Sequence, residues 1–167
     1  SKIASLVTAA AFVAAVILSF GTHATLFNGA YRVDAFSQLF KLILGLGYIV
    51  VLLLGRSLDD IRQDIRSEYY LFLSLGIRGL ALLFSSIEII SIVISLELSS
   101  YPLYLMVAMR RERDGQRVQM ESAIKYMMFG IAANGIMFFG LSYLFGLTGT
   151  TSLPLLVTRL APVLGNP

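Results

Sequence analysis

Residues 91–104 read SIVISLELSSYPLY, and this stretch decides the fold class. It places the carboxylate of Glu97 in the middle of a segment that is apolar enough to cross a membrane. Pro102 follows on the same segment and removes one backbone N–H from the helix. Because an acid at that depth is costly to keep, Glu97 is a candidate functional residue. The alternative is a structural glutamate that is satisfied by neighbouring helices.

The composition of the whole chain indicates a membrane protein. Of its 167 residues, 57% are hydrophobic and only 14% are charged, whereas a soluble domain has about 25% charged residues. Most charges lie in two patches, Arg56–Glu68 and Arg110–Glu121. The net charge of +3 is spread over loops and forms no continuous basic stripe, so nucleic acid is not an expected partner. The chain has no cysteine, which excludes disulfides, thiolate metal sites and thiol catalysis.

Five apolar windows approach the roughly 20 residues that a membrane-spanning helix requires. The sequence therefore predicts an all-α integral membrane protein with about five transmembrane helices. These helices cover about residues 3–20, 35–54, 69–84, 87–109 and 123–145. We expect residues 1–146 to form the transmembrane bundle, and residues 147–167 to be an external loop or the start of the next segment. The alternative, a soluble helical bundle, leaves the five runs and the charge pattern unexplained.

The arginines in the loops predict the orientation of the bundle. Arg56, Arg62 and Arg66 lie between the second and third predicted helices. The loop between the fourth and fifth predicted helices carries Arg110, Arg111, Arg113 and Arg117. Since positive charges favour the cytoplasmic side of a membrane, both loops are expected in the cytoplasm.

The residues around Pro102 favour a hydrated cavity beside Glu97. Pro102 has no N–H, so the carbonyl of Leu98 loses its helical partner. Within a membrane that carbonyl needs a neighbouring group or a water molecule. Ser99 and Ser100 add hydroxyl groups at the same level. The alternative is an ordinary proline kink, which is common in membrane-spanning helices.

Three cations also lie within the predicted helices. Lys125, near the cytoplasmic end of the fifth helix, either extends to the interface or relays protons. Arg78, near the middle of the third helix, either pairs with an acid such as Glu97, extends to the interface or contacts another subunit. Lys41 is expected to reach toward the outer surface.

Two segments carry a family resemblance: LELSSYPLYLMVA at residues 96–108 and SAIKYMMFGIAANGIMFFGLSYLFGLTGTTSL at residues 122–153. They resemble the antiporter-like subunit N of proton-pumping NADH:quinone oxidoreductase, respiratory complex I. The resemblance covers nearly the whole chain and is best over residues 27–153. It implies that Glu97 is the family's essential intramembrane glutamate and that Lys125 matches a less constant lysine on the next helix. It assigns proton transfer to these two residues, and possible modulation to Arg78, Pro102, Ser99 and Ser100.

The resemblance also implies partners and a location. The chain would be a proton-translocating subunit of the enzyme, without catalytic, metal-binding or cofactor-binding residues of its own. NADH, FMN, iron–sulfur clusters and quinone would belong to partner subunits. The expected contacts are the lipid bilayer and other membrane subunits, including paralogous antiporter-like ones. The location would be a bacterial or archaeal cytoplasmic membrane, or an organelle inner membrane.

Two departures from the family pattern leave alternatives open. Arg78 occupies a position that is usually apolar, and the chain ends before the broken seventh helix that carries the family's central lysine. We therefore expect a fragment or a split subunit. The rival interpretations are a homologous subunit of a hydrogenase, of a ferredoxin- or F420-linked dehydrogenase or of a cation/proton antiporter complex, and a purely structural membrane subunit.

Overall fold

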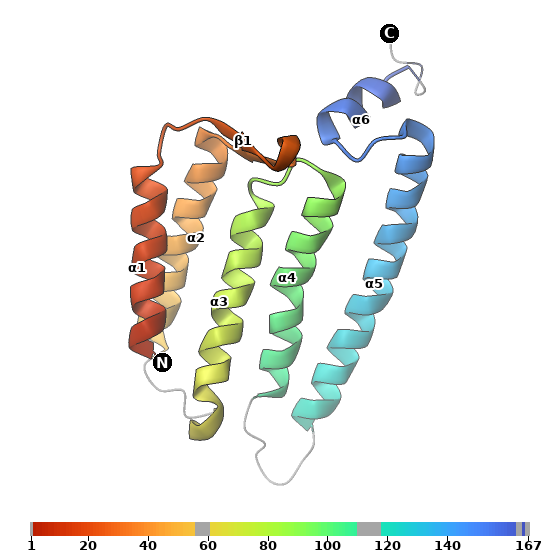
Figure 1. The fold of residues 1–167 in the computed structure, drawn as a ribbon. Coiled ribbons are helices and arrows are strands. Elements are labelled where there is room, and N and C mark those ends of the chain that lie inside the picture. Colours follow the sequence, from red (N-terminus) through yellow and green to blue (C-terminus); the bar gives the residue numbers. More distant parts are fainter. Residues whose placement is uncertain (1, 56–60, 110–117, 163–164, 166–167) are drawn as a thin grey trace.

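The computed structural model describes residues 2–55, 61–109, 118–162 and 165. Five long helices stand side by side, and a short sixth helix lies across one end (Figure 1). The helices are α1 (Lys2–Leu18), α2 (Ala35–Leu54), α3 (Arg66–Leu83), α4 (Ile89–Ala108), α5 (Val118–Thr148) and α6 (Leu153–Leu160). The remaining elements are strands β1 (Ala24–Leu26) and β2 (Tyr31–Val33) and the 3-10 turns η1 (Phe27–Gly29) and η2 (Gln63–Ile65).

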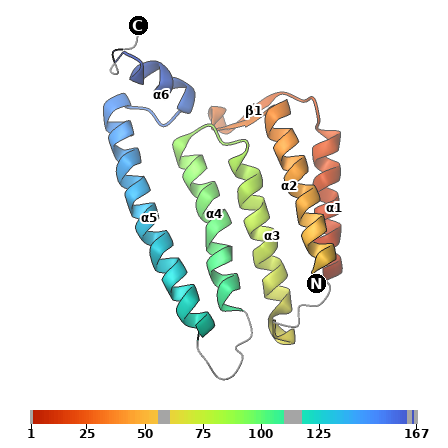
Figure 2. The ribbon, with the colours of Figure 1, turned by 180° about the vertical axis from the view of Figure 1, so that it is seen from behind.

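The long helices have membrane-spanning character. Among the described residues, three segments are long and apolar enough to cross a bilayer: Ala35–Leu54, Ile89–Ala108 and Gln119–Thr148. α1 is a shorter apolar helix of 17 residues, and α3 carries charged residues at both its start and its middle. Because α1 and α3 run alongside the three apolar spans (Figure 2), the chain is an all-α membrane bundle.

The ends of the observed helices differ from the predicted ranges. α5 extends beyond the predicted range 123–145 in both directions, and α3 begins at Arg66 instead of residue 69. Polar residues such as Gln119 and Glu121 continue the helix although they do not belong to the apolar run. The cause is that hydropathy reports which residues suit lipid, whereas backbone hydrogen bonding decides where a helix ends.

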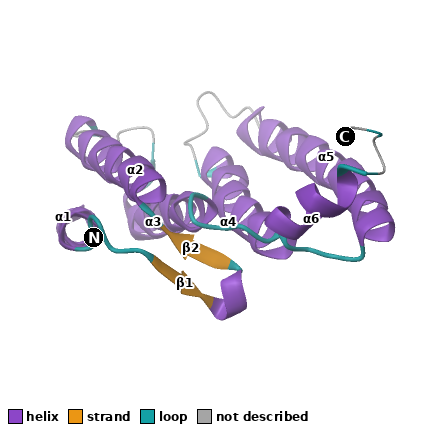
Figure 3. Ribbon diagram, turned by 90° about the horizontal axis from the view of Figure 1, so that it is seen from above, coloured by secondary structure: helices purple, strands orange, loops and turns teal. Residues whose placement is uncertain are grey.

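A β-hairpin that the apolar pattern of the sequence does not predict connects α1 to α2. β1 and β2 pair in antiparallel fashion, and Figure 3 shows the hairpin at the end of the bundle. At the tip, Asn28 and Gly29 adopt positive φ angles of 54° and 87°. Strands of three residues are too short to show the alternating pattern that identifies a strand in a sequence.

The turn between α3 and α4 is held from both sides. From the hairpin, the N–H of Arg32 donates to the carbonyl of Ser85 at 2.7 Å. From the segment between α5 and α6, the carbonyl of Thr151 accepts the N–H of Ile89 at 2.8 Å. The hydroxyl of Thr151 also donates to the carboxylate of Glu88 at 2.7 Å. These contacts set the height at which α4 begins, and therefore the depth of every residue on α4.

The start of α2 is closed by a capping box. The N–H of Ser37 donates to Oδ1 of Asp34 at 2.8 Å, and the N–H of Asp34 donates to Oγ of Ser37 at 3.0 Å. This arrangement satisfies two backbone donors that a helix end otherwise leaves free. The hydrogen bond from the Ser37 backbone lowers the pKa of Asp34, with partial burial opposing it and Arg32 adding to the lowering.

We expect Asp34→Ala to destabilise the subunit by about 1 kcal/mol, because it removes the cap. Asp34→Asn is the control, since an amide oxygen also accepts the Ser37 N–H and asparagine is an equally good cap. The pKa of Asp34 is lower in the folded state than in the unfolded state. Its charge therefore stabilises the folded state above the unfolded pKa of about 3.9, and this stabilisation is lost as the pH falls through the folded-state pKa. The measurement is the midpoint of thermal denaturation of the purified complex; equal midpoints for the two variants at neutral pH would contradict the assignment.

Candidate functional site

Glu97 lies on the side of α4 that faces α5. α4 residues at the spacing 93, 97, 100 and 104 share one helix face. On this face, Val93 packs in a cluster with Met137 of α5, and Tyr104 meets Gly130 and Tyr126 of the same helix. Glu97 lies between these two contacts. It is therefore a carboxylate within a helix–helix contact, about midway along a membrane-spanning helix.

The carboxylate of Glu97 has an unsatisfied acceptor. Its Oε2 atom is fully buried and has no hydrogen-bond partner among the described residues. Glu97 belongs to none of the ion pairs in the described ranges. A buried acceptor of this kind is costly unless it gains a proton or a hydrogen-bond donor such as water. The geometry therefore suits a group that takes up a proton.

The opposite face of α4 packs tightly against α3. Ser99 and Pro102 are buried there, and the backbone of Ser99 lies directly against Gly79 and Gly76 of α3. The helix continues through Pro102 as far as Ala108. Ser99 donates its hydroxyl to the carbonyl of Leu96 at 2.7 Å, within its own helix. Ser99 and Pro102 thus place α4 against α3 and do not face α5 with Glu97.

Tyr104 is the largest polar neighbour on the Glu97 face. It is only 6% exposed, and its ring meets the ring of Tyr126 edge-on, with 4.7 Å between centroids. The absence of a side chain at Gly130 makes room for the ring: a Cβ there would lie 2.6 Å from Cζ of Tyr104. The contact of Tyr104 with α5 was not predicted from the sequence. The available signal was the small residue, Gly130, that lies opposite this tyrosine on the next helix.

Lys125 lies in the second turn of α5, near the loop end of the bundle. Its side chain is 65% exposed in this chain and forms an ion pair with Glu121, one helical turn earlier. Its neighbour in sequence, Tyr126, contacts Tyr104. Since Tyr104 is seven residues beyond Glu97 on α4, Lys125 and Glu97 differ in depth by about 10 Å. The structure does not bring these two predicted residues into contact.

Arg78 and Glu97 are not brought together either. Arg78 lines a cavity between α1, α2 and α3, on the side of α3 away from the glycines that contact α4. It is exposed and belongs to no ion pair in the described ranges. The pairing of Arg78 with Glu97, one of three possibilities from the sequence, is therefore not formed in this structure.

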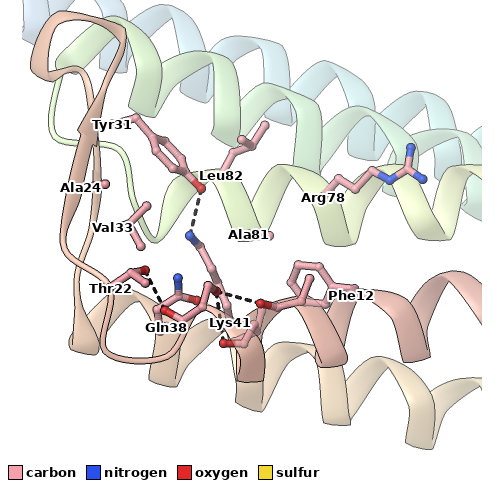
Figure 4. A pocket seen from close by; sticks show the side chains of 13 residues that line it. Phe12, Thr22, Ala24, Tyr31, Val33, Gln38, Lys41, Arg78, Ala81 and Leu82 are labelled. Atoms are coloured by element: carbon pink, nitrogen blue, oxygen red, sulfur yellow. Dashed lines mark hydrogen bonds between the residues drawn. The ribbon is translucent and has the colours of Figure 1, made fainter.

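Lys41 extends in the expected direction, toward the hairpin end of the bundle. It does not reach the surface there, because its side chain is buried, with 6% exposure. Its Nζ atom donates to the hydroxyl of Tyr31 at 2.9 Å (Figure 4). It also donates to the hydroxyl of Ser85 at 2.6 Å. The inward residues of α2 follow helical spacing and include polar ones: Ser37, Gln38, Lys41, Gly45, Tyr48 and Leu52. That polar stripe in an apolar helix was the available signal.

The orientation rests partly on residues that lie outside the described ranges: Arg56, Arg110, Arg111, Arg113 and Arg117. Arg62 and Arg66 are described: Arg62 precedes η2 and Arg66 begins α3. The start of α3 lies at the opposite end of the bundle from the hairpin (Figure 1). Among the described residues, no group of three or more His, Cys, Asp or Glu is arranged to hold a metal ion.

Comparison with known proteins identifies the family. A family described as "NADH:quinone oxidoreductase/Mrp antiporter, TM" matches residues 86–166, the part of the chain that contains Glu97 and Lys125. NADH-quinone oxidoreductase subunit N 2 of Opitutus terrae is 58% identical over all of this chain, which covers 35% of that relative. This chain belongs to the subunit N family of NADH-quinone oxidoreductase. The relative of the same name from Syntrophobacter fumaroxidans is 39% identical over 99% of the chain and 34% of its own length.

A solved structure agrees with this membership of the subunit N family. A chain of respiratory complex I from Thermus thermophilus with bound Aureothin matches with a TM-score of 0.74 and 28% identity. The match covers 98% of this chain and 37% of that chain. The chain thus spans about a third of the length of the subunit N relatives. It is a multi-pass membrane protein, and its bacterial relatives place it in the cytoplasmic membrane.

Proposed function

We propose that this chain is part of a proton-translocating membrane subunit of a respiratory NADH:quinone oxidoreductase, in which Glu97 and Lys125 transfer protons. One observation carries the proposal: the buried Oε2 atom of Glu97 has no hydrogen-bond partner among the described residues. A carboxyl group in such a place changes its interactions greatly when it gains or loses a proton. Ionisable residues that line proton paths in membranes are found in settings of this kind.

The path between Lys125 and Glu97 requires intermediate groups. The roughly 10 Å between their levels is too far for one hydrogen bond. Ser100 and Tyr104 share the helix face of Glu97 and carry hydroxyl groups, which both donate and accept. Water molecules would bridge the remaining gaps.

The modulating residues act in different ways. Pro102 and Ser99 hold α4 against α3, and so fix the position of Glu97. Ser100 lies on the helix face that Glu97 shares. Arg78 acts only at a distance, through its charge, because it lies on the far side of α3. We propose that residues 1–146 form the membrane bundle, and that residues 147–167 lead toward the next segment.

The proposed partners supply the redox chemistry. The chain has no cysteine to ligate an iron–sulfur cluster and no suitable histidine pair, since it has one histidine. We therefore assign the iron–sulfur clusters to other subunits of the complex, and we propose that NADH, FMN and quinone also bind there. Paralogous antiporter-like subunits and the lipid bilayer are the proposed neighbours of this chain.

Infrared difference spectroscopy tests whether Glu97 changes its protonation. In the whole complex, the spectrum is compared between the resting state and steady NADH oxidation. We expect a band of a protonated carboxyl group that changes between the two states and disappears in Glu97→Gln. An unchanged carboxyl spectrum in the native complex would instead favour a purely structural role for Glu97.

A further inference from the structure

Arg78 has no acidic partner among the described residues of this chain. It lies on α3, five residues before the end of the helix at Leu83, and its side chain is exposed. It belongs to none of the ion pairs in the described ranges, and neither of the two cavities that it borders has an Asp or Glu in its lining. A cation within a membrane bundle is costly unless it reaches water or meets an acid.

The side chain of Arg78 points toward the middle of the membrane. At a rise of about 1.5 Å per residue, Arg78 is about 7.5 Å from the hairpin end of α3 and about 18 Å from the other end. Its side chain extends along α3 away from the hairpin, and so away from the nearer interface (Figure 4). This direction is the usual one, because helical side chains lean toward the N-terminus of their helix. Arg78 therefore does not extend to the interface, and it faces away from Glu97.

The face of α3 that carries Arg78 is uncovered in this chain. Residues 71, 75, 78 and 82 share this face by helical spacing. Leu71 is 60% exposed, Leu82 is 41% exposed and Leu75 is partly buried. Apart from Arg78 this face is apolar, as expected of a surface that meets lipid or another helix.

An open groove of about 540 Å³ runs beside Arg78, between α1 and α3 at the hairpin end; we call it the α1–α3 groove. Its walls are largely apolar and include Phe12 and Ala15 of α1 and Leu82 of α3. Pockets of about 300–1,000 Å³ hold small ligands, so the groove has room for several side chains. The charged residues in its lining are Arg78 and Lys41, and both are positive. The groove is therefore complementary to an apolar segment that carries an acid.

We propose that a membrane-spanning helix of a neighbouring subunit lies against the α1–α3 groove and pairs an Asp or Glu with Arg78. The inference concerns assembly and goes beyond the proposed proton transfer. A guanidinium group matches both oxygens of a carboxylate, and arginine is the cation best suited to an ion pair away from water. Leu71 and Leu82 provide apolar contacts on either side of the pair. One such pair fixes the register of the two helices, because any shift along the groove separates the charges.

The position of the groove favours another subunit as its occupant. α6 lies beside the end of α5, at the opposite edge of the bundle from α1 (Figures 1 and 2). The next segment, to which residues 147–167 are proposed to lead, would therefore approach the α5 edge. A lipid phosphate fits the site poorly, since headgroups lie outside the hydrocarbon core and the guanidinium points away from them.

Photo-crosslinking tests which molecule occupies the groove. Benzoylphenylalanine replaces Leu82, one turn from Arg78, and the products formed in the whole complex are identified by mass spectrometry. The control carries the same probe in place of Ile43, an exposed residue of α2 outside the lining of the groove. We expect the probe at residue 82 to couple to another subunit, within about one helical turn of an Asp or Glu, and the probe at residue 43 not to couple there. A probe at residue 82 that couples only to lipid, only to this subunit or to a helix without an acid would overturn the proposal.

Charge exchange tests the ion pair itself. Arg78→Glu places two acids together, so we expect the amount of assembled complex on native electrophoresis to fall at least about fivefold. Replacing the acid found by cross-linking with Arg, in the same complex as Arg78→Glu, should restore most of this loss. Arg62→Glu is the matched control, because Arg62 is 67% exposed and lies outside the long helices. Native assembly of Arg78→Glu, or no restoration by the exchange, would contradict the pairing.

These outcomes are separate from those of the proposed function. Cross-linking and assembly are measured without proton transport, so they do not depend on the role of Glu97. If Glu97→Gln transports protons normally and the probe at residue 82 couples to an acidic helix, the interface stands and the role of Glu97 fails. If Glu97→Gln is inactive and the probe couples only to lipid, the proton path stands and the interface fails.

Discussion

Glu97→Gln is expected to lower NADH-driven proton transport by the whole complex by at least about tenfold. Glutamine has nearly the same shape and keeps a carbonyl acceptor, but it does not take up or release a proton at physiological pH. The side chain is within the α4–α5 contact, so a substitution of equal size should preserve the packing of Val93 and Tyr104 around it. The expected loss is therefore one of function and not of assembly.

The measurement is the pH change inside liposomes that contain the purified complex, per NADH oxidised. Glu121→Gln is the matched control, because that glutamate is exposed and its ion pair with Lys125 is a surface pair of small energy. We expect the control to retain most of the native transport. The alternative result is that Glu97→Gln assembles poorly while the complex that does assemble transports protons at the native rate. That result would assign Glu97 a structural role.

Gly79→Ala is expected to disrupt the contact between α3 and α4. A Cβ at residue 79 would lie 2.5 Å from the backbone nitrogen of Ser99 and 2.8 Å from the carbonyl carbon of Leu98. Both atoms belong to the backbone, so the two helices must move apart to accept the methyl group. Overpacking of this kind typically costs about 1–3 kcal/mol. Because Glu97 is on the displaced helix, proton transport should fall as well.

Gly47→Ala on α2 is the matched control, since a Cβ at residue 47 meets no other atom within 4 Å. The measurements are the amount of subunit in the assembled complex, by native electrophoresis, and the midpoint of its thermal denaturation. We expect a clear loss for Gly79→Ala and none for Gly47→Ala. Equal values for the two variants would show that α3 and α4 are not in such close contact.

Several features were accessible from the sequence because each depends on local information. A run of apolar residues predicts a helix in lipid whatever surrounds it, since each backbone N–H finds its partner within the same helix. The position of Glu97 within such a run follows directly from counting residues. The hairpin was missed because β1 and β2 are three residues long and owe their stability to the turn between α3 and α4, which is distant in the sequence.

The surroundings of two cations, Arg78 and Lys41, depend on how the helices pack against one another. From the sequence, pairing with an acid such as Glu97 was one of three possibilities for Arg78, and Lys41 was expected to reach toward the outer surface. In the structure, Lys41 is buried among hydroxyl groups, and Arg78 lines a cavity on the far side of α3 from α4. Gly76 and Gly79 bring α3 close to the backbone of Ser99 on α4, and this contact is not visible as a difference in hydropathy.

The sequence by itself determined that the chain enters a membrane as several helices and that an acid lies deep in one of them. It also carried the family resemblance that the comparisons confirmed. Only the tertiary structure decided which side of each helix faces its neighbours, and so which polar residues meet. The physical reason is that lipid tails are as apolar as a helix–helix contact. Helices in a bilayer therefore show little contrast between their faces, and the close fit of small residues such as Gly79 against Ser99 sets their rotation.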